Sequence, residues 1–209
     1  MQRVLLADDH PLFREALGTT IRHIWPDVAV DEVDCLRDAM AALDVAASYE
    51  LVLLDLKLPD CDGFGGLLAL RSTHPDTAIA IVSAREDSAT ISNAIACGAA
   101  GFIPKSATAA RLREALEAIL AGDVWTPDDH GPPPTDAVRA IASLSPAQLR
   151  ILSGLRRGLL NKQIAYEISV TEATVKAHMT ALFRKLGVTS RTQALILAQA
   201  LDVEAPTSA

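Results

Sequence analysis

The chain has 209 residues, half of them apolar, and a formal net charge of −7. This length suits one large or two small domains. No apolar run approaches the roughly 20 residues of a membrane span, so we expect no membrane partner. The three cysteines lack metal-ligand spacing, and the early acidic residues do not fit a signal peptide. We therefore expect reduced thiols and a cytoplasmic location.

The charge is divided unevenly along the chain. Residues 1–124 carry ten basic and 19 acidic side chains, whereas residues 144–209 carry eight basic and four acidic ones. An acidic part joined to a basic part indicates two tasks, with nucleic acid as a candidate partner for the basic part. This excess of positive charge is also typical of an ordinary surface, so charge alone does not settle the matter.

Short apolar runs alternate with helical segments in the first part of the chain. The predicted strands are Val4–Ala7, Val28–Val33, Leu51–Leu54, Ala78–Val82 and Gly101–Ile103. The clearest helical periodicities cover Pro11–Trp25, Leu36–Ala47 and Ala107–Leu120. Alternation of this kind indicates a parallel sheet with helices on both faces. We predict an α/β domain over residues 1–121, with a flavodoxin-like, doubly wound, five-stranded parallel sheet.

Carboxylates end two of the predicted strands. Asp8 and Asp9 follow the first apolar run, and Asp55 follows the third. Because ligands bind at the carboxyl edge of such sheets, these side chains should meet there. Three carboxylates repel one another unless a cation joins them, and oxygen ligands of this kind favour Mg²⁺. The pattern predicts phosphoryl chemistry at Asp55. An alternative for Asp8 is an N-cap for the helix that begins at Pro11.

Two further polar residues should reach the same edge of the sheet. Ser83 ends the fourth apolar run and Lys105 follows the fifth. A hydroxyl can donate to a phosphoryl oxygen, and a lysine offers it a compact positive charge. A lone lysine after a strand is usually only solvated. The prediction therefore depends on five polar positions all falling at strand ends.

Residues 1–124 resemble the receiver domain of two-component response regulators. The matching segments are Asp8-Asp9-His10, Asp55-Leu-Lys-Leu-Pro-Asp-Cys-Asp-Gly63, Ser83-Ala84 and Phe102-Ile-Pro-Lys105. The resemblance implies that a sensor histidine kinase supplies a phosphoryl group to Asp55. It implies that Asp9, Asp55 and the backbone carbonyl of Lys57 bind Mg²⁺, with help from Asp8.

The same resemblance assigns roles around the phosphoryl group. Ser83 and Lys105 would hold its oxygens, and Phe102 would be the switch aromatic that moves inward. Alternatives stay open: Phe102 also fits a plain core position. Asp60, Asp62 and His10 are expected to be loop or turn residues.

Residues 122–143 break all periodicity and are predicted to be a linker. The consecutive prolines Pro132–Pro134 indicate a stiff, extended spacer. A short helix is expected at Asp136–Ala142, before the second domain.

Residues 144–209 are predicted to form a small all-α domain. A first helix starts at Ser145-Pro146 and stops at Gly158. The remaining helices are predicted at Lys162–Ile168 with Asn161 as cap, Glu172–Leu186 with Thr171 as cap and Gly187 as stop, and Arg191–Leu201. Two helices joined by a tight turn form a helix-turn-helix.

The third of these helices has the pattern of a DNA-recognition helix. Its outward face should lie in the major groove, and nearby basic residues should neutralise phosphates. The predicted DNA contacts are Lys162, Thr174, Lys176, Ala177, Thr180, Arg184 and Lys185.

This part resembles the LuxR-type helix-turn-helix, the output domain of NarL/FixJ-type response regulators. The match rests on Leu144-Ser-Pro, Gly158-Leu-Leu-Asn-Lys-Gln-Ile-Ala165, Thr174-Val-Lys-Ala-His178 and Lys185-Leu-Gly-Val. The chain departs from the family pattern at Ala147-Gln148, which puts a local salt bridge in doubt, and at Thr180, which leaves base readout thin.

Together the two resemblances imply a transcription factor, not an enzyme. Phosphorylation at Asp55 would control homodimer formation and binding to double-stranded DNA, with RNA polymerase as a further candidate partner. The unphosphorylated receiver would restrain the DNA-binding domain or hold it monomeric. The alternatives are an aspartyl-phosphate phosphotransferase, which would need a substrate pocket, and a receiver whose output binds RNA or a protein. A small-molecule sensor of the LuxR type is disfavoured, because the phosphoacceptor domain fills the N-terminal half.

Overall fold

The computed structural model describes residues 3–45, 49–127 and 133–199. Its main sheet has five parallel strands in the order β2-β1-β3-β6-β7, which confirms the predicted doubly wound sheet. The strands are β1 (Arg3–Ala7), β2 (Ala29–Val33), β3 (Leu51–Asp55), β6 (Ala78–Ser83) and β7 (Gly101–Pro104). Every residue of the central strand β3 is buried, because helices cover both faces of the sheet.

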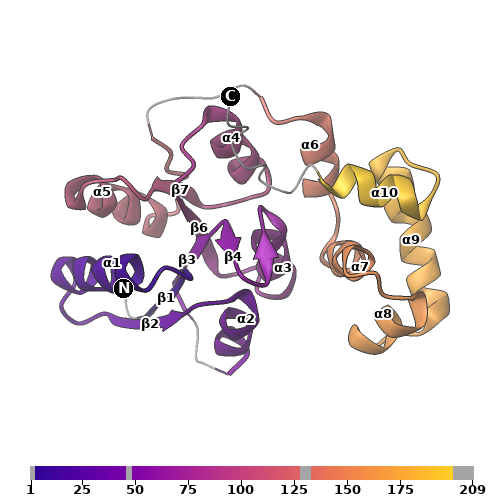
Figure 1. The fold of residues 1–209 in the computed structure, drawn as a ribbon, viewed down its shortest axis with the longest axis horizontal. Helices are drawn as coiled ribbons and strands as arrows, with labels where there is room; N and C mark the ends of the chain where they lie inside the picture. Colours follow the sequence, from indigo (N-terminus) through magenta and orange to yellow (C-terminus); the bar gives the residue numbers. More distant parts are fainter. Residues whose placement is uncertain (1–2, 46–48, 128–132, 200–209) are drawn as a thin grey trace.

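Helices form a layer on each side of this sheet. Helices α1 (Pro11–Ile24) and α5 (Ala109–Leu120) cover one face (Figure 1). The other face is covered by α2 (Leu36–Val45), α3 (Gly65–Thr73) and α4 (Ser88–Ala96). Helix α3 starts with two glycines, and none of its residues is fully exposed, so its sequence carries little helical periodicity.

The segment after Asp55 is a small hairpin, although the sequence indicated only a loop. Strand β4 (Lys57–Leu58) pairs in antiparallel fashion with β5 (Cys61–Asp62). The Gly63 N–H donates to the Leu56 carbonyl at 2.8 Å and closes the segment. Gly63 has a φ of 65°, a conformation that glycine adopts without strain, which supports its predicted turn role.

From residue 133 to the end of the described chain there are five helices. The first, α6 (Asp136–Ala142), is the short helix expected within the linker, and α7 (Pro146–Arg156), α8 (Asn161–Glu167), α9 (Glu172–Leu186) and α10 (Arg191–Ala198) follow it. The predicted caps Ser145 and Thr171 accept hydrogen bonds from Gln148 N and Thr174 N, at 3.3 and 3.1 Å. Gly187 ends α9 with a φ of 66°.

Two predictions for this part need correction or fall outside the description. Asn161 is not the cap of α8: it is the first helical residue, and Leu160 takes the cap position. A side chain still serves that end of the helix, because Gln163 Oε1 accepts from Leu160 N at 2.8 Å. Pro132 and Leu201, which belonged to the predicted spacer and the last predicted helix, lie outside the described residues.

The start of the linker is attached to the edge of the sheet. Trp125 is largely buried and forms a parallel bridge with Gly101 of β7. Its carbonyl accepts from Phe102 N at 2.9 Å, and its N–H donates to the Ala100 carbonyl at 3.3 Å. The outer edge of β7 is therefore paired with the chain that leaves the domain.

The C-terminal helices pack on the α2–α3–α4 side of the sheet. Helix α7 lies against α3, and α6 lies against α4 (Figure 1). Apolar contacts continue across this boundary, since Leu68 of α3 and Leu152 of α7 belong to one hydrophobic cluster. Helix α9 lies on the far side of α7 from the sheet (Figure 1). Among the described residues, none of the helices is both long and apolar enough to cross a membrane.

Candidate functional site

Four side chains with ligand atoms gather at the carboxyl edge of the sheet. Asp8, Asp9, His10 and Asp55 each place one such atom within 4.8 Å of the others. The register explains the proximity: Ala7 of β1 pairs with Leu54 of β3, so the residues that follow them emerge side by side. The structure thus brings together the carboxylates that the sequence placed at two strand ends.

Lys105 reaches into this acidic group from the end of β7. Its Nζ lies 2.8 Å from Asp55 Oδ2, where it donates a hydrogen bond, and 2.6 Å from Asp8 Oδ2. The Lys105 N–H also donates to the Ser83 carbonyl at 2.8 Å, which ties β7 to the end of β6. The ammonium lies over the ring of Phe13, 4.7 Å from its centroid.

Burial controls the acidity of Asp55. Loss of hydration raises the pKa of Asp55 above its ordinary value, and the negative charge of Asp8 acts in the same direction. The hydrogen bond and charge of Lys105 oppose this rise without cancelling it. A nucleophilic carboxylate must be ionised, so additional positive charge here favours the reactive form.

Asp8 forms a tight turn with His10. Its Oδ1 accepts from His10 N at 2.8 Å, and His10 Nδ1 lies 2.7 Å from Asp9 Oδ1. The residue at the N-cap of α1 is His10, whose side chain makes no capping bond. The capping alternative for Asp8 is therefore wrong, and His10 contacts the acidic group directly although a plain loop role was expected.

The donor set fits a hard divalent cation. Asp8 Oδ2 is buried and accepts no hydrogen bond, because the nearby Lys105 ammonium approaches it outside hydrogen-bond geometry. Mg²⁺ prefers carboxylate oxygens as ligands, and this oxygen has no hydrogen bond to lose. Asp8, Asp9 and Asp55 are the side chains that could hold the ion. Lys57, whose carbonyl was predicted as a further ligand, begins β4 two residues after Asp55.

Ser83 ends β6, the strand that pairs with the strand of Asp55, and Phe102 lies in β7, one strand further out. Ser83 is buried, and its Oγ accepts from Arg85 N at 3.1 Å. Phe102 is fully buried in the core. That position suits both an inward-turned switch aromatic and a plain core residue, the two alternatives for this side chain.

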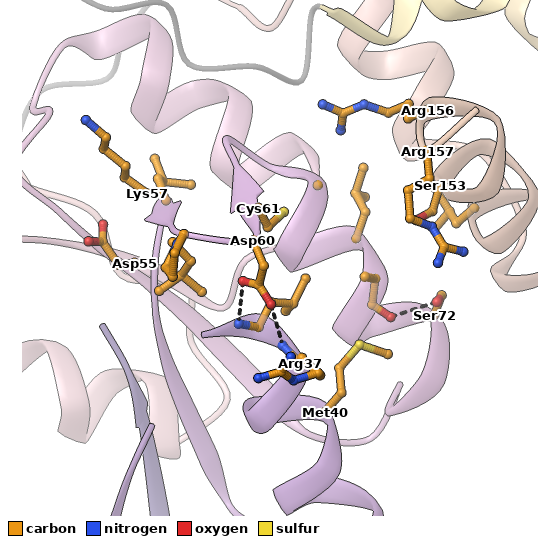
Figure 2. A pocket seen from close by; sticks show the side chains of 18 of the residues that line it. Arg37, Met40, Asp55, Lys57, Asp60, Cys61, Ser72, Ser153, Arg156 and Arg157 are labelled. Atoms are coloured by element: carbon orange, nitrogen blue, oxygen red, sulfur yellow. Dashed lines mark hydrogen bonds between the residues drawn. The ribbon is translucent and has the colours of Figure 1, made fainter. Parts of the chain in front are cut away.

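Sequence reasoning missed one residue near this site. Asp60, at the tip of the β4–β5 hairpin, accepts from Leu36 N at 2.8 Å and from Arg37 N at 2.9 Å (Figure 2). Both donors belong to the first turn of α2. The partners lie more than 20 positions away in the sequence, so no local pattern could have revealed the contact.

A cleft of about 1400 Å³ extends from the acidic edge of the sheet to the C-terminal helices. The hairpin and α2 line one side of it, and α7 contributes Ser153, Arg156 and Arg157 on the other (Figure 2). Arg157 is paired with Glu167. The cleft therefore lies at the boundary where the sheet domain meets the helical domain.

The outward face of α9 is accessible. Lys176, Ala177, Thr180 and Arg184 are exposed, as is Lys162 on α8. Helices α1 to α5 do not cover this face (Figure 1).

Several of the predicted DNA contacts have intramolecular partners. Thr174 is half-buried, and its hydroxyl lies 2.8 Å from that of Thr171. Lys185 turns toward α6, where its Nζ donates to the Ser143 carbonyl at 2.8 Å. Lys176 makes an ion pair of 3.0 Å with Glu172, one helical turn earlier on an exposed surface.

Comparison with protein families finds two matches along the chain. Residues 4–117 match the response regulator receiver domain, and residues 142–198 match the bacterial regulatory proteins of the luxR family. The chain is 38% identical to the glycerol metabolism activator of Pseudomonas putida, with 98% of each chain covered. It is 32% identical to the probable transcriptional regulatory protein NarL of Mycobacterium tuberculosis, covering 92% of this chain and 91% of the relative.

Solved structures show the same fold. A LuxR family DNA-binding response regulator from Silicibacter pomeroyi superposes with a TM-score of 0.55 at 31% identity, over 61% of this chain and 98% of that one. RcsB from Salmonella enterica serovar Typhimurium, bound to promoter P1flhDC in the presence of phosphomimetic BeF3⁻, gives a TM-score of 0.57. That likeness covers 95% of this chain and 98% of RcsB at 21% identity, and it bears on the fold alone.

Proposed function

The chain belongs to the response regulators that join a receiver domain to a LuxR-type DNA-binding domain, and we propose that Asp55 is its phosphoacceptor. Members of this family regulate transcription and are not enzymes. What is proposed here is the residue-level switch: which side chains accept the phosphoryl group, which stabilise it, and which bind DNA.

One observation carries the proposal. Lys105 Nζ lies within 2.8 Å of Asp55 Oδ2 and also contacts Asp8, in a nest that Asp9 and His10 complete. Burying an isolated carboxylate would cost free energy. Asp55 instead has the Lys105 ammonium beside it, and the carboxylates of Asp8 and Asp9, which could bind a metal cation, lie close by. Phosphoryl transfer needs positive charge around the transferred oxygens, which is what this arrangement offers.

The side chains divide the work as follows. Asp55 attacks the phosphorus atom of the donor, so a bond from its carboxylate oxygen to phosphorus forms while the bond to the donor's leaving group breaks. Lys105 and the Ser83 hydroxyl hold the phosphoryl oxygens, and Phe102 responds to the engagement of Ser83. Asp8, Asp9, Asp55 and the Lys57 carbonyl would hold Mg²⁺, which supplies charge neutralisation at these oxygens.

The division of the chain follows from these roles. We assign residues 1–121 to the receiver, residues 122–143 to the linker and residues 144–209 to the DNA-binding domain. Contacts with double-stranded DNA are assigned to Lys162, Thr174, Lys176, Ala177, Thr180 and Arg184. Lys185 is left out of this set because its ammonium binds the Ser143 carbonyl. A cytoplasmic location for this protein, a sensor histidine kinase as phosphodonor, a homodimer on DNA and contact with RNA polymerase complete the proposal.

Genomic footprinting tests the switch most directly. The wild-type protein and Asp55→Asn are each incubated with fragmented genomic DNA, with and without Mg²⁺ and acetyl phosphate. Intact-protein mass spectrometry follows phosphorylation in the same samples. We expect one added phosphoryl group on the wild type alone, together with new or stronger footprints.

Two results would contradict the proposal. A wild-type protein that gains no phosphoryl group from any small donor in Mg²⁺ would remove the phosphoacceptor role. Labelling of Asp55→Asn to the same extent as wild type would place the acceptor elsewhere in the chain. Ser83→Ala is a matched control, since it keeps the acceptor but lacks a hydroxyl at the phosphoryl oxygens.

A further inference from the structure

Asp60 connects the phosphoacceptor segment to a helix on the face of the sheet. Its two carboxylate oxygens accept from Leu36 N and Arg37 N at 2.8 and 2.9 Å (Figure 2). These N–H groups begin α2, and the first turn of a helix has no intrahelical acceptors for them. A carboxylate is also favoured at this end of a helix by the helix dipole. The contact is therefore an N-cap supplied by a distant loop.

The same contact fixes the tip of the hairpin. Leu56 and Leu58 are buried, so their side chains anchor the strand that leaves Asp55. The tip, Pro59-Asp60, projects to the surface, where Asp60 is exposed. Two-stranded hairpins of this size are not stable by themselves, since two residue pairs cannot offset the entropy of ordering the backbone. Through its two bonds to α2, Asp60 supplies a second attachment for the hairpin tip.

Lys57 lies between these two anchors. It begins β4, two residues after Asp55 and three before Asp60, and it pairs with Asp62 of β5. Its side chain is exposed, and the group proposed to reach the cation is its backbone carbonyl. A carbonyl ligand must be held in a fixed direction to meet the geometric demands of Mg²⁺. Residues that orient metal ligands are themselves important for metal affinity.

We propose that Asp60 is a positioning residue: by binding the first two N–H groups of α2, it holds the β4–β5 hairpin so that the Lys57 carbonyl can serve the cation beside Asp55. This inference rests on the proposed function and adds a residue outside the acidic nest to it. It predicts that loss of Asp60 weakens cation binding and phosphorylation at Asp55 by disordering the hairpin, while Asp8, Asp9, Asp55 and Lys105 stay in place.

The test compares Asp60→Ala and Asp60→Asn with wild type and with Thr108→Ala. Thr108 caps α5 through Arg111 N, so its replacement removes a helix cap remote from the hairpin. Mg²⁺ dissociation constants are measured by calorimetry on the unphosphorylated full chain. Melting temperatures, and hydrogen exchange of the Leu36 and Arg37 amides, are measured in parallel.

We expect Asp60→Ala to weaken Mg²⁺ binding about tenfold and to slow labelling by acetyl phosphate at subsaturating Mg²⁺. Asp60→Asn, which keeps one carbonyl acceptor, should show a smaller loss. Exchange at Leu36 and Arg37 should accelerate in both variants. Thr108→Ala should lower the melting temperature but leave the Mg²⁺ dissociation constant within about twofold of wild type.

The outcomes separate the two proposals. An Asp60→Ala protein that melts at a lower temperature but binds Mg²⁺ as tightly as wild type would show that Asp60 only caps α2, and it would overturn this inference alone. A wild-type protein that neither binds Mg²⁺ nor accepts a phosphoryl group would overturn the proposed function as well. Weakened Mg²⁺ binding in Asp60→Ala but not in Thr108→Ala supports the positioning role.

Discussion

The backbone N–H of Phe102 donates a hydrogen bond of 2.9 Å to the carbonyl of Trp125. Phe102 lies in β7, which pairs with β6, and β6 in turn pairs with the strand of Asp55. Trp125 lies near the start of the linker to the DNA-binding helices. A change at Phe102, the proposed switch aromatic, is thus one hydrogen bond away from the chain that leaves the receiver. Glu114 and Arg111 of α5 flank the indole, through a 3.4 Å contact to its Nε1 and a cation–π contact.

Trp125 should therefore report phosphorylation. In a Trp25→Phe background it is the one remaining tryptophan, because the sequence has two. We expect its fluorescence emission to change in intensity or wavelength when acetyl phosphate and Mg²⁺ are added, since the segment shifts against Glu114 and Arg111. Fluorescence titration measures the change.

Two variants calibrate that signal. Asp55→Asn in the same background should give no change. Gly101→Ala should alter the emission before any donor is added, because a Cβ at this position would lie 3.0 Å from the Trp125 carbonyl and 2.6 Å from Ile119 Cδ1. Identical emission spectra with and without phosphorylation, in a protein shown by mass spectrometry to be phosphorylated, would contradict a coupling between Asp55 and Trp125.

Asp55→Asn should stabilise the unphosphorylated protein near neutral pH in the absence of divalent cations. Burial, opposed by Lys105, leaves the pKa of Asp55 higher in the folded chain than in the unfolded one. The folded state then binds the proton more tightly, so this group's contribution to stability is complete at low pH and is lost as the pH rises through the folded pKa. Asparagine cannot ionise and avoids that loss.

Thermal melts from about pH 4 to about pH 8 measure this effect. The melting temperature of Asp55→Asn should exceed that of wild type by a few degrees at the upper end, and the gap should narrow as the pH falls. Asp87→Asn is the opposite control: burial pushes its pKa upward, but Thr90 and Arg85 outweigh burial and hold the pKa of Asp87 below its ordinary value. Its replacement should therefore destabilise most at neutral pH. A difference in melting temperature between Asp55→Asn and wild type that does not change with pH would contradict a raised pKa for Asp55.

The two lysines of α9 should behave differently in DNA binding. Lys176 is exposed on the outward face, whereas Lys185 donates to the Ser143 carbonyl. Replacing a lysine that contacts a phosphate reduces the slope of log affinity against log salt by about one. Lys176→Ala should show this reduction on a random-sequence duplex, measured by fluorescence anisotropy at several salt concentrations.

Lys185→Ala should leave the salt slope unchanged and instead lower the melting temperature, because it removes a contact between α9 and α6. A Lys185→Ala protein whose slope falls as much as that of Lys176→Ala would restore Lys185 to the DNA-contacting set.

The three cysteines should differ in reactivity. Burial raises the pKa of Cys97 to about 12 and also raises the pKa of Cys35. Cys61, in the hairpin, is partly exposed. Since the thiolate is the reactive form, a disulfide reagent at mildly alkaline pH should modify Cys61 first and Cys97 at least about a hundredfold more slowly.

Peptide mapping by mass spectrometry after timed quenching identifies the modified residue. Cys61→Ser should remove the fast phase and leave the slow one. Equal rates at Cys61 and Cys97 in the folded protein would contradict the burial of Cys97.

The parallel sheet and its acidic edge were predictable because they depend on short-range patterns. A buried strand such as Leu51–Asp55 is an unbroken apolar run, and a carboxylate at its end meets other strand ends by geometry alone. The caps at Ser145 and Thr171 were equally local. In each case the determining residues lie within a few positions of one another.

What escaped prediction depends on distant partners. Strands of two residues, as in the hairpin, are shorter than any detectable period. The roles of Asp60 and Lys185 are set by the N-terminus of α2 and the end of α6, more than 20 positions away in each case. Asn161 is a good cap by composition, but Leu160 has the extended backbone that the cap position needs, and Gln163 supplies the acceptor.

The accessibility of α9 while the domains remain packed has a regulatory consequence. A regulator whose reading surface is open before any signal arrives obeys mass action at its promoters, so its copy number sets a background level of occupancy. Phosphorylation then increases this background occupancy, either by favouring dimers or by lengthening the time that the protein stays bound to DNA. Occupancy does not start from zero. Overproduction of the unmodified chain should therefore raise promoter occupancy in the same direction as phosphorylation does.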